Sequence, residues 1–306
     1  MSLSITAVLL TLATANIYSP PSGPSVDSLR ARIQRRVAEQ HGAIVGIAYH
    51  DLQTGDSLYL NADDSFHAAS TMKVPVMIEL FRSIDAGALR LDQGILLVNQ
   101  FGSIVDASPY SLDAGDDSDS SAYKLVGTRV PLKELIDRMI TRSSNLATNA
   151  LIELVRASNA NATAHMLGAR NIRVLRGVED GKAFRAGMNN TTTARDLAVL
   201  LEAIETGRAA SRSSCDAMRE ILLHQEFNEE IPAGLPPGTR VAHKTGWISG
   251  VLHDAAVVYP PPGRKPYVLV VLTRDIPDEK VARRLIADIS RLVWAHAVPD
   301  RVATNP

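Results

Sequence analysis

A serine and a lysine three residues apart can form a nucleophile and its base. Residues 67–80 read HAASTMKVPVMIEL, and Ser70 and Lys73 stand where a polar segment becomes an apolar-periodic one. On a helix, residues three apart lie on one face, so the two side chains can meet. Lys73 can act as base only when it is partly neutral, which requires burial or nearby positive charge to lower its pKa from about 10.4. At a helix start, Ser70 also has an unpaired backbone N–H that can face a developing oxyanion.

This spacing is weak evidence by itself, because two fixed positions often coincide by chance. Ser121 and Lys124 match it as well, within the acidic stretch 111–124, SLDAGDDSDSSAYK. No apolar helix is expected behind this second pair, and we interpret it as fortuitous. The same stretch lacks the spaced oxygen ligands and closing glutamate of an EF-hand, so the sequence predicts a solvated loop there rather than a calcium site.

Two further motifs follow in order. The segment TRSSNLATNALIELV gives S-x-N at 143–145 at the start of a predicted helix, and AHKTGW gives K-T-G at 244–246 within a predicted strand. Taken singly, Ser143 could cap a helix, Asn145 could satisfy backbone groups, and Lys244 could be a surface charge. As an ordered set, S-x-x-K, S-x-N and K-T-G resemble the serine β-lactamase and penicillin-binding protein superfamily, and within it the class A β-lactamases. The resemblance covers roughly residues 26 to 297.

The side chains of the second motif are expected to act in proton transfer and in substrate binding. Ser143 offers a hydroxyl that could relay a proton between Lys73 and a leaving nitrogen. Asn145 offers an amide that could hold an acyl-amide side chain of the substrate and contact Lys73. Ser70, Lys73 and Ser143 would then complete the groups needed for acylation.

The third motif would bind substrate. Lys244 would place a cation beside a substrate carboxylate, and Thr245 would add a hydroxyl donor. Gly246 lets the strand backbone approach a ligand closely. By analogy with the family, the backbone N–H of Trp247 would join that of Ser70 in an oxyanion hole.

The groups expected to hydrolyse the acyl-enzyme depart from the family pattern. Class A enzymes use a glutamate and a held water, on a loop ahead of a threonine-rich helix start. Here residues 176–196 read RGVEDGKAFRAGMNNTTTARD, and Glu179 is the best match. An aspartate follows it where the family usually has proline, the E-x-x-L-N continuation is absent, and asparagines 189–190 replace the acid that closes the loop. Glu179 could alternatively be an exposed loop acid or pair with Lys182 or Arg176.

Other polar side chains near these motifs are assigned to structure. Ser144 stands where the family usually has aspartate, a residue that is commonly structural. His253 and Asp254 suggest a triad with Ser70, but adjacent strand residues point to opposite faces, so we expect a structural or rim role. By the same alternation, His243 should face away from the cleft.

The elements that would position these residues fall into three blocks. An amphipathic helix at 26–41 and a hairpin over 43–61 come first, and helical segments fill the middle of the chain. Valine-rich strand signals return over 239–275, before an amphipathic helix at 279–298.

This order predicts an α/β chain of the α+β type. Its sheet would be mostly antiparallel, built from both chain ends and covered by the terminal helices, with a helical subdomain inserted. We expect one catalytic domain over 26–306, in which a sheet part, about 26–66 plus 226–306, flanks a helical part at about 67–225. A cleft where the two parts meet is a usual place for a small-molecule site.

Composition excludes several classes of function. The 306 residues include 32 basic and 33 acidic side chains, so nothing favours binding to nucleic acid or anionic lipid. Cys215 is the only cysteine, which excludes an internal disulfide and a cysteine zinc site. No metal or organic cofactor is implied, because acyl transfer through serine needs neither. A monomer is expected by default for this family.

The N-terminal stretch resembles an export signal. An apolar run at 5–13 precedes an A-x-A pattern at 13–15, although the first basic residue is Arg30. The run is shorter than the roughly 20 residues that span a bilayer. We therefore interpret residues 1–25 as a signal or dispensable tail, and expect a periplasmic or secreted protein.

The leading hypothesis is a serine hydrolase that opens β-lactams or related amides through an acyl-serine at Ser70. The alternatives are a D-Ala-D-Ala peptidase or esterase of the same fold, and a β-lactam or cell-wall binding protein that acylates and deacylates slowly. A third class is a protein that keeps the fold without the chemistry.

Overall fold

The centre of the molecule is one antiparallel sheet. The computed structural model describes residues 25–299. Five strands form the sheet in the order β2-β1-β11-β10-β9, so the first two strands of the chain pair with the last three. The strands are β1 (Ile44–Asp51), β2 (Ser57–Leu60), β9 (Arg240–Ile248), β10 (Val251–Tyr259) and β11 (Tyr267–Arg274). The predicted sheet built from both ends of the chain is confirmed.

Two tight connections set the register of these strands. Gly55 in the β1–β2 turn and Gly250 between β9 and β10 have φ of 81° and 74°, a conformation that glycine adopts without a steric penalty. Only Ser249 and Gly250 separate β9 from β10, and Val251 therefore lies opposite Ile248. This hairpin places the strand with the K-T-G motif at the edge of the sheet.

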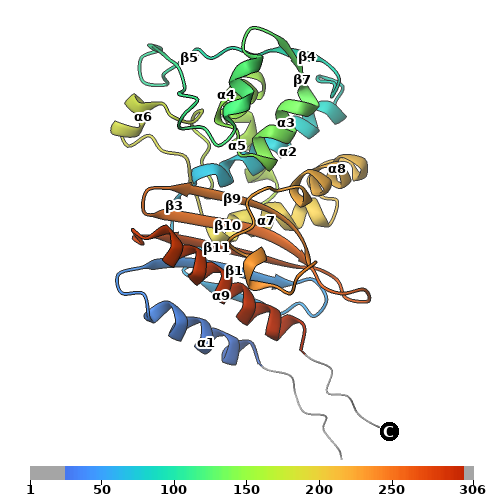
Figure 1. Ribbon diagram of the computed structural model, residues 1–306. Helices are drawn as coiled ribbons and strands as arrows, with labels where there is room; N and C mark the ends of the chain where they lie inside the picture. Colours follow the sequence, from blue (N-terminus) through green and yellow to red (C-terminus); the bar gives the residue numbers. More distant parts are fainter. Residues whose placement is uncertain (1–24, 300–306) are drawn as a thin grey trace, which may run out of the picture.

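The terminal helices cover one face of the sheet. Helices α1 (Val26–Ala38) and α9 (Glu279–Ala297) pack side by side there (Figure 1). Leu29 and Ile33 of α1 and Leu285 of α9 are completely buried. They share a core with every second side chain of the strands, such as Ile47 and Val271. The strand period of two and the helix period of 3.6 thus bring one apolar face of each element into this core.

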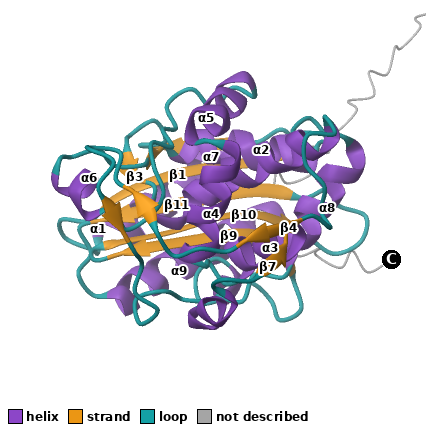
Figure 2. Cartoon of the chain, turned by 90° about the horizontal axis from the view of Figure 1, so that it is seen from above, coloured by secondary structure: helices purple, strands orange, loops and turns teal. Residues whose placement is uncertain are grey.

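The inserted helical block covers the other face (Figures 1 and 2). Helix α7 packs directly on β1, β10 and β11, and α2 is surrounded by α3, α4, α5 and α8. The helices of this block are α2 (Lys73–Asp85), α3 (Leu132–Thr141), α4 (Asn145–Val155), α5 (Ala157–Met166), α6 (Gly181–Arg185), α7 (Ala194–Glu205) and α8 (Arg212–Leu223). Cys215 is buried in α8, as expected for a small helix residue.

Short elements connect these layers. Three two-stranded pairs join β3 (Phe66–His67) to β8 (Thr191–Thr192), β4 (Gly94–Leu96) to β7 (Arg129–Pro131), and β5 (Phe101–Gly102) to β6 (Pro109–Tyr110). The 3₁₀ helices are η1 (Ala69–Met72), η2 (Ser120–Leu125) and η3 (Pro232–Gly234). The pairing of β3 with β8 brings the start of α2 beside the end of the segment that carries Glu179.

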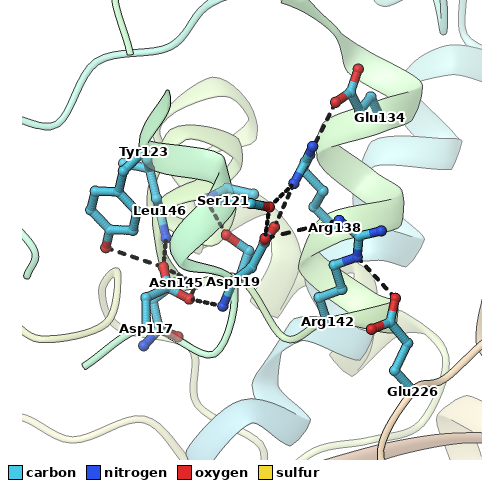
Figure 3. Close-up of polar contacts among 12 residues, drawn as sticks. Asp117, Asp119, Ser121, Tyr123, Glu134, Arg138, Arg142, Asn145, Leu146 and Glu226 are labelled. Atoms are coloured by element: carbon cyan, nitrogen blue, oxygen red, sulfur yellow. Dashed lines mark hydrogen bonds and ion pairs between the residues drawn. The ribbon is translucent and has the colours of Figure 1, made fainter. Parts of the chain in front are cut away.

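The acidic stretch at 111–124 is only in part the solvated loop that the sequence predicts, because Asp113 and Asp116 are exposed but its other two aspartates are buried. Asp117 and Asp119 are only 7% and 4% exposed. Asp119 pairs with Arg138 of α3 at 2.8 Å, and the hydroxyl of Ser121 donates a hydrogen bond to Asp119 within η2 (Figure 3). For Asp117 and Asp119 the prediction was wrong, because their carboxylates find charged and N–H partners far along the chain, which offset the cost of their burial.

The predicted signal segment at 1–25 lies outside the described residues, except for Ser25, whose side chain caps α1. Among the helices of residues 25–299, none combines the length and apolarity needed to cross a bilayer. The predicted boundaries between the sheet part and the helical part stay a prediction.

Candidate active site

Ser70 lies in the 3₁₀ turn η1, which leads directly into α2 with Lys73 as its first residue. In a 3₁₀ turn, side chains three apart eclipse one another, so Ser70 and Lys73 project from the same edge. Ser70 is half-buried, whereas Lys73 is completely buried. Ala69, just ahead of the serine, has φ of 44°, a backbone conformation that costs energy for a non-glycine residue. Such strain is typical of functional sites.

The buried amine of Lys73 is held by the second motif. Its Nζ lies 2.6 Å from the backbone oxygen of Ser143, 3.1 Å from Ser143 Oγ and 3.0 Å from Asn145 Oδ1. Burial lowers the pKa of Lys73 well below its usual value, and the positive charge of Lys244 lowers it further. The structure therefore favours the neutral, basic form of Lys73 more than exposure to solvent would.

Lys244 faces the same hydroxyl from β9. Its Nζ lies 3.1 Å from Ser143 Oγ and donates to the backbone oxygen of Thr245 at 3.0 Å. Burial is the main reason why the pKa of Lys244 falls to about 7. The side chain is completely buried, so the alternative of a surface charge is wrong. Ser143 Oγ thus lies between two amines and can exchange protons with either.

Strand β9 packs against the nucleophile turn at Gly246. A Cβ at this position would lie 2.9 Å from the backbone nitrogen of Ser70 and 3.0 Å from that of Thr71. Only glycine allows the strand backbone to come this close. The structure brings it against the serine turn, whereas the sequence predicted a close approach to a ligand. Trp247 follows, with 56% of its surface exposed.

Glu179 reaches the site through Asn145. The Nδ2 of Asn145 donates to Glu179 Oε1 at 2.7 Å, while Oδ1 of the same amide faces Lys73. Glu179 is exposed, as one of the alternatives has it, and partial desolvation raises the pKa of its carboxyl group. The two alternative ion pairs do not form: Lys182 binds Asp106 at 2.9 Å, and Arg176 donates to backbone oxygens.

The loop segment that carries Glu179 is anchored on both sides. On one side, the Oδ1 of Asn149 accepts the N–H of Val178 at 2.6 Å, and its Nδ2 donates to Val178 O at 3.1 Å. On the other side, Asp180 accepts from Ser103 Oγ and the N–H of Ile104, both at 2.9 Å. Neither anchor has a local signal in the sequence, since their partners lie 29 and about 77 residues away. They fix Glu179, whose φ of 62° is itself strained.

Asparagine rather than an acid closes this loop. Oδ1 of Asn190 accepts the N–H groups of Leu175 and Arg176 at 2.8 and 3.2 Å, and Nδ2 donates to the oxygen of Arg176 at 3.0 Å. The amide pairs with backbone groups on both of its atoms, which a carboxylate could not do. The departure at 189–190 therefore leaves the loop closed.

The histidines near the motifs are structural, as expected. His253 is buried, and its Nε2 lies 2.8 Å from the backbone oxygen of His67, just ahead of the serine turn. Asp254 instead pairs with His243 at 3.0 Å and accepts the N–H of Ile231. Burial lowers the pKa of His253 to about 4, so this ring is neutral near pH 7. Neither His253 nor Asp254 forms a triad with Ser70.

A cavity of about 410 Å³ opens over the serine. Of the predicted site residues, Ser70, Asn145, Glu179 and Trp247 line it, whereas Lys73, Ser143 and the K-T-G residues do not. Other lining residues are His67, Arg176, Val178, Phe184 and Arg185. The walls thus combine apolar side chains with two guanidinium groups. Within residues 25–299, no three or more His, Cys, Asp or Glu side chains are grouped to hold a metal ion.

This combination of fold and site defines a β-lactamase-like protein, and comparison with known proteins agrees. A model of the β-lactamase enzyme family matches residues 28–297. The chain therefore belongs to the β-lactamase enzyme family.

Curated relatives and solved structures extend this result. β-Lactamase AST-1 of Nocardia asteroides is 29% identical over 303 residues, covering 96% of this chain and 93% of its own. β-Lactamase VEB-1 of Pseudomonas aeruginosa is 22% identical, with 95% and 96% covered. The structures of PBP-A and of a β-lactamase from Sphaerobacter thermophilus DSM 20745 are each 29% identical, with TM-scores of 0.75 and 0.74. They cover 90% and 89% of this chain, and 97% and 98% of their own. These neighbours confirm the predicted fold class.

Proposed function

We propose that the protein is a serine hydrolase that opens β-lactams through an acyl-serine intermediate at Ser70. The observation that carries the proposal is one hydrogen-bonded chain of side chains, two of which, Asn145 and Glu179, line the same cavity as Ser70. It runs from Lys244 through Ser143, Lys73 and Asn145 to Glu179. Such a chain can deliver protons to both sides of an acyl-transfer reaction.

Acylation uses one end of this chain. Neutral Lys73 takes the proton of Ser70, whose Oγ attacks the lactam carbonyl carbon. The N–H groups of Ser70 and Trp247 would stabilise the oxyanion, with Gly246 holding strand and turn together. As the carbon–nitrogen bond breaks, Ser143 gives its proton to the leaving nitrogen and recovers one from Lys73, which returns to its neutral form.

Deacylation uses the other end. Glu179 takes a proton from water, and the resulting hydroxide attacks the ester carbonyl carbon. The carbon–oxygen bond to Ser70 then breaks, and Ser70 Oγ takes up the proton that Glu179 had accepted, which restores the Glu179 carboxylate. Partial desolvation raises the pKa of Glu179, which makes its carboxylate a stronger base than that of a freely solvated glutamate. Asn145 orients this carboxylate through its 2.7 Å hydrogen bond.

The charged, polar and apolar groups of the site indicate which parts of a substrate would bind. When protonated, Lys244 supports binding of a substrate carboxylate, and we assign a hydroxyl contact with the same group to Thr245. Val178, Phe184 and Trp247 in the cavity wall favour an apolar acyl side chain.

The test separates reaction from binding. Turnover of a chromogenic cephalosporin is measured beside that of a p-nitrophenyl ester, and intact mass is recorded after exposure to penicillin. Wild type should turn over the cephalosporin, and Ser70→Ala should show no covalent adduct. An adduct that persists in Ser70→Ala would refute the assignment.

One second function has specific support: a penicillin-binding protein that deacylates slowly. The sequence around Glu179 departs from the class A pattern, and PBP-A is among the similar structures. Another similar structure, 29% identical with a TM-score of 0.75, is a single-residue mutant of PBP-A in an acyl-enzyme complex with penicillin G. Stoichiometric acylation without steady turnover in wild type would favour this second function.

We expect export to the periplasm or the exterior, where such substrates occur, and a monomer in solution. Detection of a mature N-terminus just after the A-x-A pattern at 13–15 in secreted material would test the export signal.

A further inference from the structure

Asp117, in the acidic stretch, binds the start of helix α4. Its two carboxylate oxygens each lie 3.0 Å from the N–H of Asn145, and Oδ2 accepts the N–H of Leu146 at 2.9 Å (Figure 3). The N–H of Asp119 and the hydroxyl of Tyr123 complete its partners at 3.0 and 3.1 Å. A carboxylate at a helix N-terminus satisfies unpaired donors and opposes the positive end of the helix dipole.

The adjacent cap residue cannot do this alone. Ser144 is the N-cap of α4, but its Oγ accepts only the N–H of Ala147, at 3.3 Å. Class A β-lactamases, which the motifs resemble, usually have an aspartate at this position. Here the carboxylate at this helix start comes instead from a residue 28 positions before Asn145.

The helix start that Asp117 holds is the one that holds Lys73. Ser143 and Asn145 supply all three hydrogen-bond acceptors of Lys73 Nζ. Ser143 has φ of 57°, so its turn needs support from outside to keep this shape.

Asp117 also differs from its neighbour Asp119 in how its charge is balanced. Asp119 has Arg138 at 2.8 Å. The partners of Asp117 are N–H groups and a phenol, so its charge acts on the site itself.

We propose that Asp117 is a positioning residue for the reaction at Ser70. Its carboxylate fixes the Ser143–Asn145 turn against Lys73 and offsets part of the positive charge of the two buried lysines. The proposal rests on the proposed function, because it assigns Asp117 to the same reaction.

The charges around Lys73 predict how its pKa should change when the charge of Asp117 is removed. The groups that face it are Lys244 from β9, Glu179 from the loop ahead of α6, and Asp117. Burial and Lys244 lower the pKa of Lys73, while Asp117 and Glu179 raise it. Removing the charge of Asp117 should therefore lower the pKa of Lys73 further, and should also lower that of Glu179, on which Asp117 and Asp116 act.

The experiment compares Asp117→Asn with Asp119→Asn, two buried carboxylates of one loop. Lysine labelled with ¹³C at Cε is titrated in the intact protein, which has seven lysines, and Lys73→Arg assigns the signal. Asp117→Asn should shift the titration of Lys73 to lower pH, and Asp119→Asn should not. The acylation rate at pH 7 should fall by about tenfold or more in Asp117→Asn, as expected when reacting groups are misplaced. Melting temperatures show whether each variant is folded.

A third variant tests where the carboxylate must stand. Ser144→Asp combined with Asp117→Asn restores a carboxylate at the same helix start, and should return both the Lys73 titration and the acylation rate towards wild type. If Asp117→Asn does not fold, the double variant alone is compared with wild type. A folded Asp117→Asn protein that titrates and acylates like Asp119→Asn would overturn the inference, and so would a folded double variant without recovery. If wild type acylates with neither substrate, the proposed function fails, but the Lys73 titration still decides the role of Asp117.

Discussion

Replacing Gly246 by alanine tests the contact between β9 and the serine turn. The new Cβ would lie 2.9 Å from Ser70 N, 3.0 Å from Thr71 N and 3.2 Å from Ala69 Cβ. Favourable contacts of this kind lie at roughly 3.5 Å or more, so strand and turn must separate by about 0.5 Å. Two of the three atoms belong to the backbone of η1, which cannot turn aside as a flexible side chain could. Overpacking of this kind costs about 1–3 kcal/mol of folding free energy.

The effect on the reaction should exceed the effect on stability. The separation moves the Ser70 N–H away from the Trp247 N–H, and a displacement of about half an ångström in such a donor pair should slow acylation by about tenfold or more. Stopped-flow acylation with a chromogenic cephalosporin measures this rate, and a thermal melt measures stability, with about 2–4 °C lost for each kcal/mol.

Gly102→Ala is the matched control. Gly102 lies in β5, and a Cβ there would meet its nearest neighbour, the oxygen of Ala107, at 3.7 Å, an ordinary contact. This variant should acylate and melt like wild type. If Gly246→Ala also matched wild type in both measurements, the close approach of strand and turn would not govern the reaction.

Three further predictions concern the remaining parts of the site. Glu179→Gln should acylate at the wild-type rate and then stall, which mass spectrometry would detect as a lasting adduct; full turnover would exclude Glu179 as the base. Asn149→Ala leaves the N–H of Val178 without its acceptor and should cost about 1–3 kcal/mol while slowing turnover more than acylation; equal slowing of both steps would contradict this anchor role. Lys244 has a folded pKa of about 7, below its unfolded value, so the folded protein binds fewer protons above pH 7 and stability should rise with pH from there to about 10. The free energy of unfolding of wild type, measured in urea, should rise by up to about 1.4 kcal/mol per pH unit, and that of Lys244→Met should lack this rise. An unchanged slope in Lys244→Met would argue against a neutral buried lysine.

Much of the fold follows from local patterns in the sequence. Valine-rich segments bounded by Gly or Pro predicted β9, β10 and β11, and their separation along the chain from β1 indicated a sheet built from both ends. The first helix ends at Ala38 rather than at 41, and Ser70 lies in a 3₁₀ turn ahead of the predicted α-helix. Helix ends depend on capping contacts that periodicity does not record.

The candidate site also has a part that the sequence predicted and a part that it did not. The motif residues could be named because their chemistry is carried by residue type and order. Asn149, Asp180 and Asp117 could not, because each acts through backbone groups far along the chain. An asparagine within a helix and aspartates in a loop have ordinary solvent-exposed uses, and only the tertiary contacts distinguish these from the buried ones seen here.

The two anchors of the Glu179 segment have a consequence for how this protein can change over time. Asn149 and Ser103 belong to the helical layer and its loops, whereas the serine turn rests on the sheet through Gly246. Under the proposed function, substitutions that loosen these two anchors should change the rate of deacylation more than the rate of acylation. A lineage with this layout could drift between capturing an antibiotic and destroying it by changes that leave every motif residue intact.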